Sequence, residues 1–189
     1  MTDSRFIPET HLDRVLVDRD RIAARVDELG RQIAETYRDQ DLTIMAVLTG
    51  SMIFLADLIR RIPLMMHIDV VSISSYPGRS TTTRGPRWLL PISTDLKDRN
   101  VLVIDDILDS GLTLQAMLSA VRAMEPASLR SCVLLRKERP DLETRFEPDF
   151  VGFDIPNEFV VGYGLDFDNL YRNVPEICLL SEHATGEQA

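Results

Sequence analysis

The chain has 189 residues, which is long enough to bury a full hydrophobic core without a disulfide or a structural metal and too short for a second large domain. It carries 30 acidic and 21 basic residues, for a formal net charge of −9 at pH 7. This balance disfavours a nucleic-acid binder, which needs clustered Lys and Arg side chains to neutralise phosphates. We therefore expect a single acidic domain over residues 1–189 and no nucleic-acid partner.

The N-terminal segment and the cysteines indicate the compartment. Charged residues occur throughout the first 21 residues, and they contain no apolar stretch typical of a signal peptide or a membrane span. Cys132 and Cys178 each lie inside an apolar run, where small unpaired thiols are common. We expect a cytoplasmic protein with no membrane partner and with two free cysteines in its core.

The first half of the chain alternates helical and strand patterns. Apolar residues recur at helical spacing after Asp18, whose side chain suits an N-cap, and short apolar runs bounded by turn residues follow. The predicted elements are a helix from Asp18 to Tyr37, a strand at residues 44–48, a turn at Gly50 and Ser51, a helix that Pro63 ends, and a strand at residues 68–74.

Residues 100–114, NVLVIDDILDSGLTL, are the most informative stretch. Four apolar residues predict a buried strand that ends at two adjacent acids, and apolar spacing from Leu114 onward predicts a helix. Backbone amides at such a helix start suit a phosphate monoester, and paired acids suit a ribose diol or a metal bridging to it. The alternative is an acidic turn of an ordinary α/β protein. The polar groups are Asp105, Asp106, Asp109, Ser110, Gly111 and Thr113.

A further strand is predicted at residues 132–135, so strands and helices alternate along most of the chain. This pattern predicts a mostly parallel sheet flanked by helices, with ligands bound at the carboxyl ends of its strands. The segment at residues 77–91 differs, because it is rich in Ser, Thr, Pro, Gly and Arg and holds the only tryptophan, Trp88. A long segment of this composition is either a functional lid or a floppy hairpin.

The 100–114 string resembles, at every position, the phosphoribosyl pyrophosphate (PRPP) motif of the type I phosphoribosyltransferases. The resemblance implies the α/β fold of that family, with a mostly parallel central sheet and a small hood. It also implies a mobile lid at residues 77–91 that closes over PRPP, since Ser75 and Tyr76 match the pair that leads into such a loop.

Residues 149–180, DFVGFDIPNEFVVGYGLDFDNLYRNVPEICLL, resemble the purine-binding hood of the hypoxanthine-guanine branch of that family. The hood is therefore expected mainly over residues 149–189. Phe159 would stack on the purine and the backbone of Val160 would read its edge, although both could simply pack a core. Lys137 would donate to the O6 carbonyl of hypoxanthine or guanine, unless it belongs to a solvated basic loop with its arginine neighbours.

The resemblance implies transfer of the phosphoribosyl group from PRPP to N9 of hypoxanthine or guanine, giving IMP or GMP and pyrophosphate. Asp109 would share the proton on the purine N7. Mg²⁺ is the implied cofactor, and the family forms homodimers or homotetramers. The remaining implied roles are ribose binding by Asp105 and Asp106, 5′-phosphate binding by Ser110, Gly111, Leu112 and Thr113, pyrophosphate binding by Leu48, Thr49, Gly50 and Arg172, and Mg²⁺ binding by Asp105, Asp106 and Asp166. Asp166 is also expected to belong to the purine-binding group.

Two positions depart from the pattern of the relatives. Asp105 stands where this branch often has Glu, and Thr49 stands where many relatives carry a basic residue. The latter predicts a less positive pyrophosphate subsite. Two alternatives remain: a xanthine-preferring enzyme, and an RNA-binding transcription attenuator of the same fold. The acid at position 109 and the negative net charge disfavour the attenuator.

Overall fold

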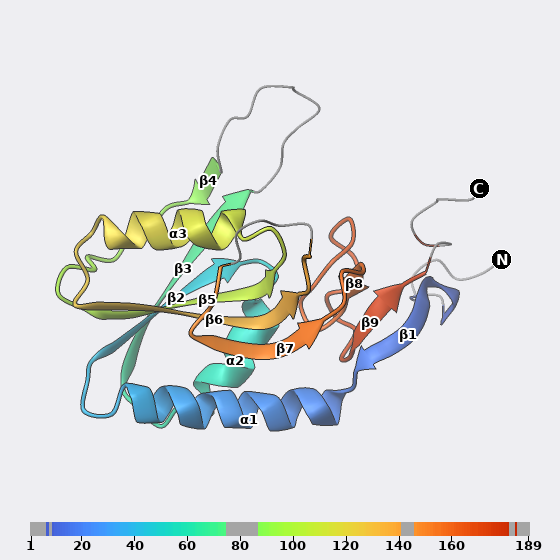
Figure 1. The fold of residues 1–189 in the computed structure, drawn as a ribbon, viewed down its shortest axis with the longest axis horizontal. Coiled ribbons are helices and arrows are strands. Elements are labelled where there is room, and N and C mark those ends of the chain that lie inside the picture. The colour runs from blue at the N-terminus through green and yellow to red at the C-terminus, as the bar shows by residue number, and fades with distance from the viewer. Residues whose placement is uncertain (1–6, 8, 75–86, 141–145, 182–183, 185–189) are drawn as a thin grey trace.

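A computed structural model describes residues 7, 9–74, 87–140, 146–181 and 184. Two sheets form its framework (Figure 1). The larger sheet has six strands in the order β4-β3-β2-β5-β6-β7, and the smaller has three in the order β1-β9-β8. The larger sheet comprises β2 (Leu42–Leu48), β3 (Met66–Ser74), β4 (Arg87–Leu90), β5 (Asn100–Leu108), β6 (Ser128–Lys137) and β7 (Phe150–Ile155). The smaller comprises β1 (Leu12–Val17), β8 (Val160–Val161) and β9 (Ile177–Leu180).

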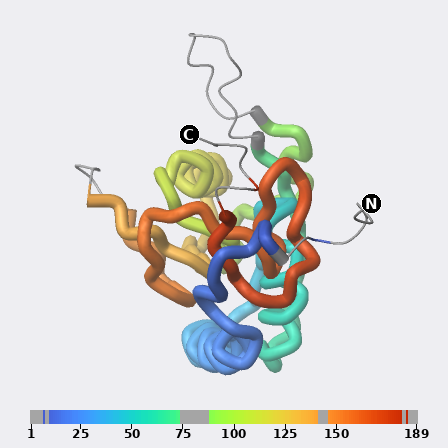
Figure 2. The backbone as a smooth tube through the Cα atoms, turned by 90° about the vertical axis from the view of Figure 1, so that its right-hand side faces the viewer, coloured from blue at the N-terminus to red at the C-terminus, as the bar shows by residue number. Residues whose placement is uncertain are grey.

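The predicted parallel sheet is confirmed for five of the six strands of the larger sheet. Strands β2, β3, β5, β6 and β7 pair in parallel, and only the edge strand β4 pairs with its neighbour β3 in the antiparallel direction. The small sheet is antiparallel and lies beyond the carboxyl ends of the parallel strands (Figures 1 and 2). A ligand site at this end of the sheet therefore has the small sheet as its neighbour.

Helices cover both faces of the large sheet (Figure 1). Helix α1 (Arg19–Thr36) and helix α2 (Met52–Ile59) lie on one face, and helix α3 (Leu112–Arg122) lies on the other. Alternate residues of β2 follow this division, because Ile44 and Ala46 pack in the α1 and α2 core whereas Met45 and Val47 pack in the α3 core. Burial on both faces explains why the strands read as continuous apolar runs.

The predicted first helix is confirmed. The Asp18 carboxylate caps α1 by accepting a hydrogen bond of 2.8 Å from the backbone N–H of Arg21. The apolar residues at helical spacing, from Ile22 to Ile33, are buried against the sheet. Both cysteines are buried and free, as expected. No helix in the described residues is long and apolar enough to cross a membrane.

Several boundaries differ from the sequence predictions. Strand β5 continues through both acids to Leu108, because its backbone stays paired with β6 as far as Leu108 and Arg136. Strand β7 belongs to the large sheet, and β1 from the N-terminal segment belongs to the small one. The segment predicted as a loop at 77–91 includes β4, whose Trp-Leu-Leu sequence favours a strand paired with β3. Ser75, Tyr76 and residues 77–86 lie outside the described residues.

One carboxylate anchors the segment that follows β4. Asp69 on β3 accepts hydrogen bonds from the backbone N–H and hydroxyl groups of Ser93 and Thr94, at 2.8 to 3.3 Å. Burial acts to raise the pKa of Asp69, but these bonds and one from the N–H of Val70 outweigh it and hold that pKa below its ordinary value.

Candidate active site

The two acids of the motif lie in the second half of β5, where Asp105 is buried and Asp106 is partly buried. Asp105 is only 5% exposed, and its carboxylate accepts a hydrogen bond of 3.0 Å from the backbone N–H of Asp106. The Asp106 carboxylate accepts one of 2.8 Å from the N–H of Ile107. Burial raises the pKa of both carboxyl groups, and the charge of Asp106 raises that of Asp105 further. Such a pair is suited to a ligand that brings positive charge or hydroxyl donors.

The turn between β2 and α2 lies directly against this acid pair. The Leu48–Thr49 peptide bond is cis. A Cβ atom on Gly50 would lie 1.6 Å from Oδ2 of Asp106, so only glycine fits at this position with the carboxylate where it is. The side chain of Thr49 is exposed beside this contact. The segment Leu48, Thr49 and Gly50, predicted to bind pyrophosphate, therefore adjoins the predicted ribose acids.

Arg172 comes to the same place from the loop between β8 and β9. Its guanidinium donates a hydrogen bond of 2.7 Å to the carbonyl oxygen of Gly164, and its charge lowers the otherwise raised pKa of Asp106. A Cβ atom on Gly164 would lie 2.2 Å from the carbonyl oxygen of Gly50. Arg172, Gly164 and the Gly50 turn thus converge on Asp106 from separate parts of the chain.

Asp166 does not complete a cluster with the β5 acids. Its carboxylate forms an ion pair of 2.8 Å with Arg172 and accepts a hydrogen bond of 2.8 Å from the N–H of Asn169. Within the described residues, no group of three or more His, Cys, Asp or Glu side chains is placed to hold a metal ion. The structure therefore does not assemble the predicted set of Asp105, Asp106 and Asp166, and it pairs Asp166 with an arginine instead.

The predicted phosphate turn follows β5 and begins α3. Gly111 is the N-cap residue and has a left-handed backbone with φ of 79°, which a residue with a side chain adopts at a cost. Ser110 and Leu112 are exposed, and Thr113 lies in the first turn of the helix. Helix α3 begins at the carboxyl end of β5, so the unpaired amides of its first turn are at the edge of the sheet where a phosphate would bind.

Asp109 is held by two cations. Lys137, the last residue of β6, places its ammonium nitrogen 3.0 Å from Oδ2 of Asp109, and Arg139 forms an ion pair with Oδ1. Burial acts to raise the pKa of Asp109, but the hydrogen bonds and charges of Lys137 and Arg139 outweigh it and lower that pKa. Asp109 is therefore ionised at neutral pH. Lys137, predicted to bind the purine, forms an ion pair with Asp109 in this structure.

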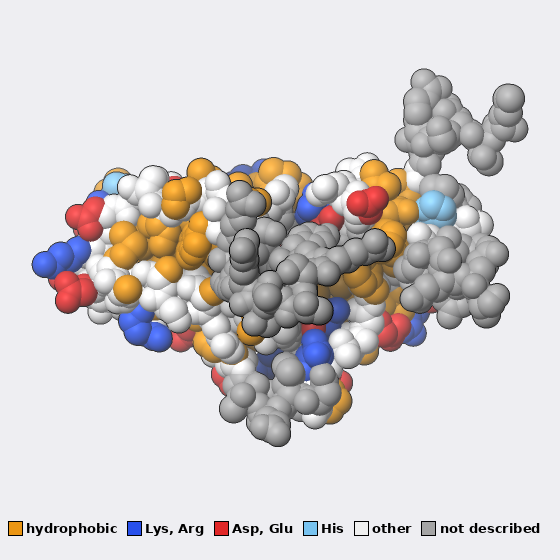
Figure 3. Space-filling view, turned by 90° about the horizontal axis from the view of Figure 1, so that it is seen from above, with side chains coloured by type: hydrophobic (Ala, Val, Ile, Leu, Met, Phe, Trp, Pro, Cys, Tyr) orange, Lys and Arg blue, Asp and Glu red, His pale blue; other side chains and the backbone are white. Residues whose placement is uncertain are grey.

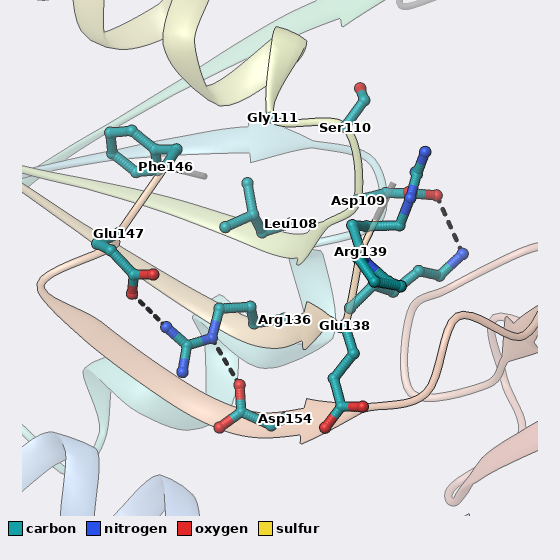
Figure 4. Close-up of a pocket in the computed structure, with 12 residues that line it drawn as sticks. Leu108, Asp109, Ser110, Gly111, Arg136, Glu138, Arg139, Phe146, Glu147 and Asp154 are labelled. Carbon is teal, nitrogen blue, oxygen red and sulfur yellow. Dashed lines mark hydrogen bonds and ion pairs between the residues drawn. The ribbon is translucent and has the colours of Figure 1, made fainter. Parts of the chain in front are cut away.

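A cavity of about 460 Å³ adjoins this ion-paired group (Figure 4). Ser110 and Gly111 lie at its upper rim in the figure, while Leu108 and Phe146 form an apolar wall. On the far side, Arg136 bridges Glu147 and Asp154, the latter at 2.5 Å. The cavity thus brings the start of α3 and Asp109 together in one concave surface.

The predicted purine-stacking residue, Phe159, immediately precedes β8 of the small sheet. Phe159 is 49% exposed, and its ring meets Phe167 edge to face with a centroid distance of 5.5 Å. The following Val160 is buried, and its backbone pairs with Leu179 of β9. Phe159 therefore does not pack a core, and part of its ring is free to stack on a ligand.

Comparison with known proteins identifies the family. The model of the phosphoribosyl transferase domain matches residues 16–168. The chain belongs to the phosphoribosyl transferase family. It is 46% identical to the hypoxanthine-guanine phosphoribosyltransferase of Mycobacterium avium over 171 residues, which cover 86% of this chain and 83% of that protein. It is 40% identical to the hypoxanthine phosphoribosyltransferase of Escherichia coli over 169 residues, 88% of this chain and 94% of that one.

Solved structures agree with the sequence matches. A hypoxanthine phosphoribosyltransferase from Staphylococcus aureus superposes with a TM-score of 0.86 at 34% identity, covering 96% of this chain and 98% of that one. One from Trypanosoma cruzi gives the same TM-score at 31% identity and the same coverage. The predicted type I phosphoribosyltransferase fold is confirmed.

In this phosphoribosyl transferase, sequence reasoning missed three site residues. Gly164 packs against Gly50 and accepts a hydrogen bond from Arg172, and Tyr163 precedes it in the same turn and donates to Asp57. Arg139 shares Asp109 with Lys137. The sequence does offer one indication of Gly164, because this glycine lies two residues before the candidate site residue Asp166. Arg139 was visible only as a member of a basic cluster, because the sequence does not indicate which anion it meets.

Proposed function

We propose that this protein transfers the 5-phosphoribosyl group from PRPP to N9 of hypoxanthine or guanine, giving IMP or GMP and pyrophosphate in purine salvage. The observation that carries the proposal is the contact of the Gly50 turn with Asp106 and, through Gly164, with Arg172, on a strand that leads directly into the turn before α3. One surface thereby offers carboxylates to a diol, a cation to a diphosphate and helix amides to a monophosphate. PRPP carries all three groups.

The 5′-phosphate would lie at the start of α3, on the amides and hydroxyls of Ser110, Gly111, Leu112 and Thr113. The ribose hydroxyls would meet Asp105 and Asp106. The burial of Asp105 makes an unpaired charge there costly and a bound hydroxyl favourable. The pyrophosphate group would lie between Leu48, Thr49, Gly50 and Arg172. Support comes from the contact of Gly50 with Asp106 and from the consecutive positions of Ser110 to Thr113 in one turn.

The two adjacent carboxylates of Asp105 and Asp106 fit Mg²⁺, which takes one or two carboxylates and keeps several waters. Asp105 and Asp106 would hold the ion together with the ribose hydroxyls. Bound there, Mg²⁺ supplies positive charge that stabilises the departing pyrophosphate. Asp166 would join only by leaving its ion pair with Arg172.

The purine would lie between Phe159 and the end of β6. Lys137 has three donors, so it can keep its hydrogen bond to Asp109 and donate to the O6 carbonyl as well. Ionised Asp109 would accept the proton shared with N7, which increases electron density at N9. The backbone of Val160 would read the purine edge, and a lid led by Ser75 and Tyr76 would exclude water during transfer.

Initial rates with hypoxanthine, guanine, xanthine and adenine, at fixed PRPP and Mg²⁺, test the proposal. Transfer to hypoxanthine or guanine supports it, and a preference for xanthine would assign the chain to the alternative specificity. Absence of transfer to every base would refute it.

The RNA-binding alternative needs a basic face, yet on the described part of the face in Figure 3 the Lys and Arg side chains are scattered among acidic and apolar ones.

The proposal includes a cytoplasmic enzyme that assembles as a homodimer or homotetramer. Light scattering on the purified protein would distinguish these assemblies from a monomer.

The exposed side chain of Thr49 gives the pyrophosphate subsite one cation fewer than a basic residue would supply, so the subsite depends more heavily on Arg172.

A further inference from the structure

Tyr163 is held in an unfavourable backbone conformation next to the site. The successive residues Gly162, Tyr163 and Gly164 all have positive φ, at 95°, 49° and 101°. Glycine adopts this region freely, whereas a bulky aromatic residue does so only where its surroundings impose it. The side chain of Tyr163 is 7% exposed, and its hydroxyl donates a hydrogen bond of 2.7 Å to Oδ2 of Asp57 on α2.

The turn that contains Tyr163 forms two hydrogen bonds with Arg172, both through Gly164. The N–H of Gly164 donates to the backbone carbonyl of Arg172 at 3.0 Å, and the carbonyl of Gly164 accepts from the Arg172 guanidinium at 2.7 Å. The N–H of Tyr163 donates to the carbonyl of Val174 at 2.7 Å. A shift of this turn therefore carries the backbone and the charged head of Arg172 with it.

The same turn also packs against the Gly50 turn, which forms the other side of the proposed pyrophosphate subsite. Gly164 packs so tightly on Gly50 that a Cβ atom there would lie 2.2 Å from the Gly50 carbonyl oxygen. Helix α2 begins two residues after Gly50 and carries Asp57 further along. Both sides of the subsite are thus attached to α2: the Gly50 turn through the chain, and Arg172 through Tyr163.

We propose that Tyr163 and Asp57 form a positioning pair that sets the spacing between the Gly50 turn and Arg172, and thereby the affinity for the diphosphate group of PRPP and for pyrophosphate. This inference rests on the proposed function. Tyr163 acts through Arg172 and Gly50 and does not contact the substrate. Asp57 also forms an ion pair with Arg60, which orients its carboxylate toward the tyrosine hydroxyl.

The test compares Tyr163→Phe with wild type, using calorimetric binding of Mg²⁺-pyrophosphate and steady-state kinetics. Loss of the hydroxyl should weaken pyrophosphate binding and raise the KM for PRPP about fivefold or more, since hydrogen bonds to charged groups are among the stronger ones. The KM for the purine should stay within about twofold, because the base is bound by other elements. Asp57→Ala should reproduce the effect, and Asp57→Asn, which keeps an acceptor oxygen, should restore most of the affinity.

Tyr37→Phe is the matched control. Tyr37 is fully buried, and its hydroxyl donates to the carbonyl of Val101 at 3.3 Å, at the opposite end of the sheet from the Gly50 turn. This variant should lower the melting temperature without changing pyrophosphate affinity.

Two results would overturn the inference. In the first, Tyr163→Phe and Asp57→Ala lose stability as Tyr37→Phe does but bind pyrophosphate like wild type. In the second, the KM for the purine rises as much as that for PRPP. If wild type itself neither binds pyrophosphate nor transfers a phosphoribosyl group, the proposed function fails first and this inference with it. If wild type is active and only the variants fail to respond, the proposed function stands. Should Tyr163→Phe not fold, the Asp57 variants decide.

Discussion

Replacing Gly50 with alanine tests whether the turn at residues 48–50 and Asp106 form one binding surface. The added Cβ atom would lie 1.6 Å from Oδ2 and 2.6 Å from Cγ of Asp106. An ordinary contact between such atoms begins near 3.4 Å. The carboxylate or the turn must therefore move by about 2 Å, the size of a full side-chain rearrangement.

The expected loss of activity follows from this displacement. A misplacement of about 1 Å at a reacting centre can reduce turnover by about 10²-fold, so Gly50→Ala should lower kcat/KM for PRPP by about 10²-fold or more. Overpacking of a tight site also costs about 1–3 kcal/mol of unfolding free energy. In a chain of this length that corresponds to a fall in melting temperature of roughly 2–12 °C.

Gly30→Ala supplies a matched steric control. A Cβ atom on Gly30 of α1 would lie 2.5 Å from Cβ of Arg61, so this variant also introduces a clash, but at a contact between helix α1 and the end of α2. We expect it to lower the melting temperature while PRPP kinetics stay near wild type. Initial rates and circular-dichroism melts on both variants make the comparison.

An Asp106→Ala variant tests the contact between Gly50 and Asp106 directly. In an Asp106→Ala protein the carboxylate is absent, so adding Gly50→Ala should cost much less stability than it does in wild type. The reasoning is refuted if Gly50→Ala keeps PRPP kinetics within about threefold of wild type, a change too small for the displacement above. An equal stability cost in both backgrounds would refute it as well.

Three further predictions concern single side chains. Asp109→Asn should keep the fold and PRPP binding but lower turnover by about 10²-fold, the usual contribution of a positioned acid–base group. Lys137→Gln should reduce the preference for 6-oxo over 6-amino purines, measured as kcat/KM ratios, by about 10-fold, as expected for a lost charged donor. Asp69→Asn should lower the unfolding free energy at pH 7 by about 1 kcal/mol in urea titrations, because its carboxylate holds Ser93 and Thr94. Since the folded pKa of Asp69 is lowered, that contribution is present above the unfolded pKa and disappears as the pH falls through the folded one.

Each of these has a contradicting outcome. Near-normal turnover in Asp109→Asn would remove its proton-sharing role. Unchanged base selectivity in Lys137→Gln would make the lysine only a partner of Asp109. A stability difference between wild type and Asp69→Asn that persists unchanged from pH 7 to about pH 3 would show that ionisation of this carboxyl group does not contribute.

The sequence by itself predicted the features whose parts are neighbours along the chain. The motif at residues 100–114 contains a strand, acids and a helix start within a few positions, and local geometry alone places them at one edge of a sheet. The first helix also depends on neighbouring residues only, because Asp18 specifies its cap and the apolar spacing after it specifies its buried face. The parallel sheet followed from the alternation of strands and helices, since parallel strands require crossovers.

Tertiary structure decided what depends on contacts between distant segments. The pairing of β1 with β9 and the place of β7 in the large sheet follow from packing around the core, which no local pattern encodes. The ion pairs of Asp109 with Lys137 and Arg139, and of Asp166 with Arg172, depend on which loops meet. The close approach of Gly50 and Gly164 to each other, and of Gly50 to Asp106, is of the same kind. A glycine in a sequence shows only that a close contact is allowed, whereas the fold determines which group makes it.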